Sequence, residues 1–125
     1  LGMGSFWEGA DFAQQDKVIE VITRLPFDNP KDPFYQKIES LLSKQGRSTF
    51  DSYSLPMTVL RFKQAIGRAQ RRPEQRSAIL LMDNRPLVKS YGKLFIKEVS
   101  QEIILKHAPF KLLKEDIQEF LEKDC

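Results

Sequence analysis

The spacing of apolar residues along the chain predicts helices that alternate with strands. Val18 to Thr23 is a short β-branched run that predicts a strand, ending near Leu25-Pro26 because proline cannot donate to a β-ladder. Ser77 to Asp83 is an almost continuous apolar run, which is typical of a buried parallel strand. Strands separated by crossover distances predict an open parallel sheet covered by helices, and therefore an α/β fold.

The first helix is predicted after a turn-rich connection. Asp32 suits the N-cap, Pro33 suits the first helical position, and Gly46 is placed to end the helix. We expect its apolar residues to share one side that packs inward; they are Phe34, Ile38, Leu41 and Leu42. Residues 47–54 are predicted to form a polar loop.

Three further helices are predicted downstream. The first runs from Pro56 to Arg72 and is stopped by Pro73, and the others run from Pro86 to Lys97 and from Phe110 to Leu121. Between the last two, residues 99–109 are ambiguous, with a short strand possible at Glu102–Leu105.

The helix from Pro56 carries the most informative stretch, Q-x-x-G-R-x-x-R. At 100° per residue, Gln64, Arg68 and Arg71 fall within about 60° of one another. The opposite side is apolar: Val59, Phe62, Ile66 and Ala69. Arginine binds phosphate bidentately and suits the charge of phosphoryl transfer, although a solvated basic helix face has the same pattern. Gly67 favours the first interpretation, because glycine inside a helix costs roughly 1 kcal/mol and usually has a packing or approach reason.

Four segments resemble motifs of one helicase family and occur in that family's order. Residues 64–71 resemble motif VI of superfamily 2 helicases, and residues 4–12 (GSFWEGADF) resemble motif V of the DinG/XPD branch. Residues 22–33 are similar to the family's I-x-R-L-P-F-x-x-P-x-D-P, and residues 83–93 contain D-x-R followed by Y-G-K. Together they resemble the C-terminal motor domain of a DinG-like ATP-dependent DNA helicase.

The resemblance implies a RecA-like fold, with residues 1–125 as a single domain that forms the C-terminal part of helicase domain 2. In this family ATP binds between two RecA-like domains, and the first supplies the phosphate loop and the acids that hold Mg²⁺. This sequence has no G-x-x-x-x-G-K-[ST] and no Asp-Glu pair after a strand. We therefore expect a fragment of a longer protein that contains the first domain, and no ATP hydrolysis by this chain alone.

The resemblance also implies roles for the motif VI residues. Arg68 and Arg71 would face the γ-phosphate as arginine fingers, with Gly67 in the same nucleotide-facing segment. Gln64 would hydrogen-bond near the phosphates or the catalytic water.

The motif V segment is implied to contact both nucleotide and DNA. Asp11 would accept hydrogen bonds from the ribose hydroxyls, with Glu8 and Gly9 positioning the loop, while Ser5 and Trp7 would border the DNA. For Asp11 a cap or turn role is an equal alternative, and for Trp7 core packing is the more common role.

Arg24 is a further candidate for DNA binding. It follows a strand at its C-terminal end, where open α/β sheets bind ligands, so it could touch a DNA phosphate or be an ordinary surface arginine.

Composition and charge allow these hypotheses without selecting among them. The 125 residues are 41% hydrophobic, enough for one domain, and carry a net charge of +3. Residues 55–76 hold six Lys/Arg against Glu74 alone, which predicts a phosphate-facing patch. Because Cys125 is the single cysteine and His107 the single histidine, we expect no metal ligands and a reduced, cytoplasmic compartment. No apolar run approaches the ~20 residues of a membrane helix.

Three functions follow for the protein that carries this chain. The first is an ATP-dependent DNA helicase acting on single-stranded DNA in repair or replication. The others are a DinG-type 3′-5′ exonuclease in which this domain responds to nucleotide, and a non-catalytic nucleic-acid-binding module. If a strand that precedes motif V is missing, the exposed sheet edge would also favour self-association.

Overall fold

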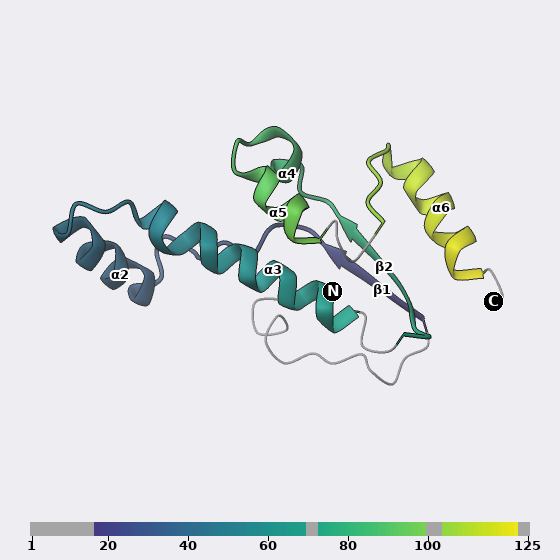
Figure 1. Ribbon diagram of the computed structural model, residues 1–125, viewed down its shortest axis with the longest axis horizontal. Coiled ribbons are helices and arrows are strands. Elements are labelled where there is room, and N and C mark those ends of the chain that lie inside the picture. The colour runs from purple at the N-terminus through teal and green to yellow at the C-terminus, as the bar shows by residue number, and fades with distance from the viewer. Residues whose placement is uncertain (1–16, 70–72, 100–103, 123–125) are drawn as a thin grey trace.

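A pair of parallel strands lies at the centre of the protein. The computed structural model describes residues 17–69, 73–99 and 104–122 (Figure 1). Strand β1 (Lys17–Ile22) pairs in parallel with β2 (Arg76–Leu81), so that Val18 lies opposite Ser77 and Ile22 opposite Leu81. The predicted α/β class and the parallel pairing are confirmed, although the residues of β2 are half-buried rather than fully buried.

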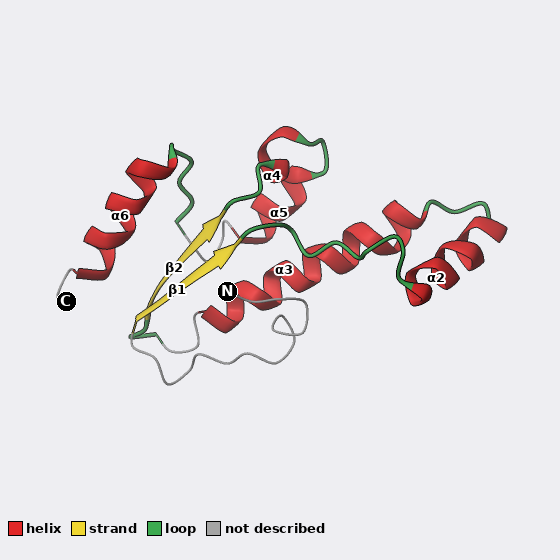
Figure 2. Cartoon of the chain, turned by 180° about the vertical axis from the view of Figure 1, so that it is seen from behind, coloured by secondary structure: helices red, strands yellow, loops and turns green. Residues whose placement is uncertain are grey.

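Helices cover the two faces of this sheet unequally. Helices α3 (Leu55–Ala69) and α5 (Gly92–Val99) lie over the face on which Val18 and Ile22 are buried. Helix α6 (Phe110–Glu122) lies against β2 on the side away from α3 (Figure 2). On that side Ile19 and Val21 of β1 remain exposed, by 55% and 36%.

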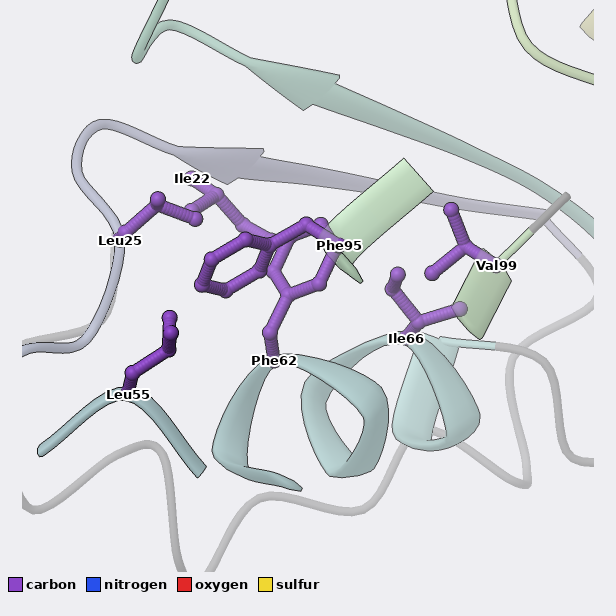
Figure 3. Packing of buried hydrophobic residues seen from close by; sticks show 7 residues of the cluster. All are labelled: Ile22, Leu25, Leu55, Phe62, Ile66, Phe95 and Val99. Carbon is purple, nitrogen blue, oxygen red and sulfur yellow. The ribbon is translucent and has the colours of Figure 1, made fainter. Parts of the chain in front are cut away.

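The core forms where α3 and α5 meet the end of β1 (Figure 3). Its buried members come from four parts of the chain: Ile22, Leu25, Leu55, Phe62, Ile66, Phe95 and Val99. Phe62 and Phe95 make an edge-to-face ring contact with centroids 5.5 Å apart. The apolar side predicted for the motif VI helix is therefore confirmed.

Helix α2 (Pro33–Lys44) begins and ends where the sequence predicts. The Asp32 carboxylate accepts hydrogen bonds from the backbone N–H groups of Phe34 and Tyr35. At the other end Gly46 has a φ of 68° and its N–H bonds to the Ser43 carbonyl, a left-handed position that suits glycine.

The predicted inward packing of α2 is wrong. None of its residues is buried, Phe34 is 65% exposed, and the helix projects from the rest of the molecule (Figure 1). Tyr35 links the helix to η1 by a hydrogen bond from the Ser54 hydroxyl, 3.1 Å long, and by a ring contact with Tyr53, whose centroid lies 6.4 Å away. Apolar periodicity thus identified a face on α2, but no surface among the described residues covers it.

The predicted loop at residues 47–54 is also wrong. Residues Phe50–Ser54 form a short π-helix, η1, that continues into α3. Its start is held by the Ser48 hydroxyl, which accepts the Asp51 N–H at 3.2 Å, and Phe50 stacks on Phe27 with centroids 6.0 Å apart. Polar composition suggested a loop because serine, threonine and aspartate side chains compete for backbone hydrogen bonds and are therefore common outside helices.

The helix predicted from Pro86 to Lys97 is two helices, α4 (Arg85–Val88) and α5, because the chain turns between them. The turn brings Gly92 against Pro86, where an added Cβ would overlap the Pro86 carbonyl. Helix α6 has nearly its predicted bounds, but Phe110 and Phe120 are exposed and Leu121 is its one buried residue. Of the ambiguous stretch, Ile104–Pro109 forms no helix or strand, and Glu102 lies outside the described residues.

Candidate functional site

The structure separates the motif VI side chains that the helical wheel had grouped. Gln64 is exposed, as predicted, but Arg68 is only 9% exposed. The Nε of Arg68 donates to the Gln64 carbonyl at 3.4 Å, one turn back along the same helix. The wheel angle describes where Cβ points, whereas the long arginine side chain folds against the domain. The prediction that Arg68 stands on an open face is therefore wrong in this conformation.

Glu20 faces α3 from the middle of β1. It lies on the same strand face as Val18 and Ile22, is half-buried, and its Oε2 has no hydrogen-bond partner among the described residues. Burial raises the pKa of Glu20 above its ordinary value, and the positive charge of Arg68 opposes that rise without cancelling it. No sequence pattern marks this carboxylate, because a single acid in an apolar strand is typical of a solvent-facing position.

Gly67 has no packing reason within the described residues. It is exposed, and a Cβ added there would meet nothing within 4 Å. Of the two reasons predicted for this glycine, close packing is not found against the described residues, and close approach by another group stays a prediction.

The predicted excess of positive charge is partly neutralised by residues distant in sequence. Arg61 donates to Asp28 at 2.8 Å and to the Pro26 carbonyl at 3.2 Å. Lys63 donates to Glu98 at 3.3 Å on the exposed surface. Tertiary contacts therefore assign two of the cations counted from sequence to carboxylates, while Arg71 and Arg72 lie outside the described residues.

A second group of polar residues lies where both strands end. An open pocket of about 330 Å³ is lined by Thr23, Arg24, Met82, Asp83, Asn84 and Arg85. Arg24 is exposed there, and no ion pair joins it to another described residue. Arg24 thus lies at the carboxyl edge of the sheet, the position expected for a ligand-binding residue of an open α/β fold.

Asp83 ties this edge together. Its carboxylate accepts the Leu25 N–H at 2.9 Å, the Arg85 N–H at 3.0 Å and the Arg85 guanidinium. Burial alone raises the pKa of Asp83, but these hydrogen bonds and the charge of Arg85 outweigh it and lower the pKa to about 2. The Arg85 guanidinium also lies over the Phe27 ring, 5.0 Å from its centroid. The D-x-R pattern was the sequence signal of this tie.

The end of α3 and the carboxyl-edge pocket lie at opposite ends of the strand pair. The Ser77 hydroxyl bonds to the Ala69 carbonyl, which sets the end of α3 beside the start of β2. Arg24 and Asp83 instead follow the strands. Five steps of about 3.3 Å separate the ends of a six-residue strand, or about 17 Å. The domain therefore has two distinct polar surfaces.

Other predicted site residues lie outside the described part of the chain: Arg71 and the motif V residues Ser5, Trp7, Glu8, Gly9 and Asp11. Within residues 17–69, 73–99 and 104–122, no three His, Cys, Asp or Glu side chains gather in a way that could hold a metal ion. The helices of that same part are all too short or too polar to cross a membrane.

Comparison with known proteins identifies the family. The sequence profile of the helicase C-terminal domain matches residues 1–102. The 3′-5′ exonuclease DinG of Bacillus subtilis (strain 168) is 38% identical over 96 residues, which are 77% of this chain and 10% of that protein. The ATP-dependent DNA helicase YoaA of Escherichia coli (strain K12) is 34% identical over 96 residues, 77% of this chain and 15% of that protein.

A third relative extends the match almost to the end of the chain. The 3′-5′ exonuclease DinG of Staphylococcus saprophyticus is 32% identical over 120 residues, 96% of this chain and 12% of that protein. The chain belongs to the family of helicase C-terminal domains. Within that family it is a DinG-like domain, as the four motifs predicted, and it spans about a tenth to a sixth of the length of the relatives it matches.

Proposed function

We propose that this chain is the second motor domain of an ATP-dependent DNA helicase. Residues 1–125 would form the C-terminal part of a RecA-like domain, and a first RecA-like domain of the same protein would hold ATP and Mg²⁺. The observation that carries the proposal is the exposed surface of α3 at Gln64 and Gly67. A glycine with open space above it lets another domain approach the helix closely.

The arginines of motif VI would complete the ATP site when the two domains close. Arg68 and Arg71 would stabilise charge that develops on the transferred phosphoryl group, and Gln64 would bind near the phosphates or the attacking water. Asp11 would bind the ribose, with Glu8 and Gly9 setting the loop. For Arg68 this requires its side chain to leave the position it has in this structure.

Single-stranded DNA would bind at a different surface. Arg24 has the charge and exposure needed for a backbone phosphate, and the carboxyl-edge pocket beside it offers the polar groups of Thr23 and Asn84. Ser5 and Trp7 would border the same strand of DNA. Separate surfaces for nucleotide and DNA fit a motor that couples the two through one rigid domain.

The direct test is DNA-stimulated ATP hydrolysis by the full-length protein. Arg71→Ala is expected to lower kcat by roughly 10³-fold or more while nucleotide binding is retained, because an arginine finger contributes about 10³–10⁵ in rate. Arg68→Ala is expected to act in the same direction. Arg47→Ala removes an exposed arginine near the end of α2 and serves as the matched control. Unchanged turnover in both motif VI variants would remove these arginines from the mechanism.

A second candidate is a 3′-5′ exonuclease in which this domain responds to nucleotide. It is favoured by the relatives from Bacillus and Staphylococcus, which carry that name, and by the staphylococcal match over 96% of this chain. Strand unwinding driven by ATP favours the helicase, whereas 3′-end digestion that ATP merely modulates favours the exonuclease. DNA binding with neither activity would leave the non-catalytic module. In every case we propose a cytoplasmic protein, and self-association of the isolated chain through the exposed side of β1.

A further inference from the structure

A cluster of aromatic side chains extends from the core to the surface. Phe95 is buried in the core, Phe27 and Tyr91 are half-buried against it, and Phe50 is 38% exposed. Phe27 follows β1, Phe50 begins η1, and Tyr91 lies in the turn between α4 and α5. Three separate segments thus bring their rings together, and the outermost ring, that of Phe50, is open to solvent.

Contacts between the rings hold Phe50 in a fixed orientation. Phe50 stacks on Phe27 with centroids 6.0 Å and planes 16° apart, and its centroid lies 5.3 Å from that of Tyr91. Tyr91 in turn meets the buried ring of Phe95 edge-on, with centroids 6.3 Å apart. Because packing already orients the Phe50 ring, little conformational entropy is lost when a flat ligand stacks on its exposed part.

The cluster adjoins the carboxyl-edge pocket through Arg85. This arginine lines the pocket, is bound by the Asp83 carboxylate, and places its guanidinium 5.0 Å from the centroid of the Phe27 ring. Since Phe50 stacks on Phe27 at 6.0 Å, its ring lies at most 11 Å from the guanidinium, the sum of the two distances. A stacked DNA strand advances about 3.4 Å per nucleotide, so roughly three nucleotides cover this distance.

Exposed cations lie on the same segments as the rings. Arg24 is exposed in the pocket, and Lys89 and Lys93 are exposed on the two sides of the turn between α4 and α5. None of these three forms an ion pair with another described residue. Asp51 in η1 is exposed as well, but the cations outnumber it. Cations that track a backbone beside a ring on which bases stack are the features by which proteins bind single strands.

We propose that Phe50 is a base-stacking residue for single-stranded DNA. This inference rests on the proposed function, in which Arg24 binds a DNA phosphate at the carboxyl edge of the sheet. A strand whose backbone follows Arg24 and Lys89 stacks an unpaired base on the open part of the Phe50 ring. The ring adds affinity that does not depend on sequence, because every base has a π-face. It also selects single strands, since the bases of a duplex are already stacked on one another.

DNA without bases separates stacking from packing. In the full-length protein without ATP, Phe50→Leu is expected to weaken binding of a labelled oligothymidylate roughly 5- to 100-fold, measured by fluorescence anisotropy. Binding of an abasic strand of the same length should not change, because that strand has nothing to stack. Phe50→Tyr keeps a ring and should bind both strands as the wild type does. Phe34→Leu removes a ring that is 65% exposed on α2 and is the matched control, with binding unchanged.

Three results would overturn the role of Phe50. They are unchanged binding of oligothymidylate by Phe50→Leu, equal weakening on the two strands, and a loss in Phe50→Tyr as large as that in Phe50→Leu. Phe50→Met, which is also apolar and lacks a ring, repeats the test if the leucine variant does not fold. If the wild type binds neither strand, the proposed DNA site itself fails, so the two failures are distinguishable.

Discussion

Replacing Asp83 with asparagine should loosen the edge of the sheet where both strands end. The Asp83 carboxylate joins Leu25, which follows β1, to Arg85, which begins α4. Its side chain is 6% exposed. Asp83→Asn keeps the shape of the side chain but removes its charge. The new NH₂ group also places a hydrogen-bond donor opposite the N–H donors of Leu25 or Arg85.

The magnitude follows from the pKa of the carboxyl group. A factor of ten in ionisation corresponds to about 1.4 kcal/mol, so the fall of the Asp83 pKa from 3.8 to about 2 represents roughly 2 kcal/mol. This is an upper value, because the Arg85 side chain is 32% exposed and water screens the pair. We expect Asp83→Asn to lower the free energy of unfolding by about 1–2 kcal/mol.

Urea denaturation of the chain, followed by circular dichroism, measures this loss. Asp51→Asn, at an exposed position in η1, is the matched control and should stay within about 0.5 kcal/mol of the wild type. The pH dependence supplies an independent check. Because the folded-state pKa of Asp83 is depressed, its contribution is present above the ordinary value of 3.8 and is lost as the pH falls toward 2.

The wild type should therefore lose more stability than Asp83→Asn between pH 5 and pH 2. Equal stability of the two asparagine variants at pH 7, or parallel pH profiles of the wild type and Asp83→Asn, would refute the reasoning.

Two substitutions elsewhere probe the packing. Gly92→Ala forces a Cβ into the Pro86 carbonyl and is expected to cost roughly 2–3 kcal/mol, measured as a lower urea midpoint; a neutral effect would mean that α4 and α5 do not meet as described. Phe95→Ala empties a core position that is 1% exposed and should cost about 3–5 kcal/mol, against less than about 1 kcal/mol for Leu41→Ala on α2, which is 53% exposed; equal losses would contradict the assignment of the core.

Local patterns were sufficient for most element positions. The β-branched run at β1, the apolar run at β2 and the Asp32-Pro33 cap each identified an element, because the signal and the structure it specifies lie within a few residues. The parallel pairing followed from the crossover length between the strands. The exposure of α2 could not be predicted in this way, since an apolar face does not show whether a partner surface exists.

For the candidate site too, the sequence identified residues by local pattern but not the contacts that tertiary packing creates. The motif VI residues were found from their spacing, and Arg24 from its place after a strand. The burial of Arg68 was not predictable, because it depends on how α3 packs in the folded domain and not on the residues next to it in the sequence. The tie made by Asp83 to Leu25 likewise spans 58 positions, and no local pattern encodes it.

The measurement that tests the central claim most directly compares ATP hydrolysis by the full-length protein and by this 125-residue chain alone, each with and without single-stranded DNA. If this domain completes an ATP site whose phosphate loop lies elsewhere, the full-length protein hydrolyses ATP faster on DNA and the isolated chain shows none above background. Clear turnover by the isolated chain, or a full-length protein without DNA-stimulated hydrolysis, would contradict the account.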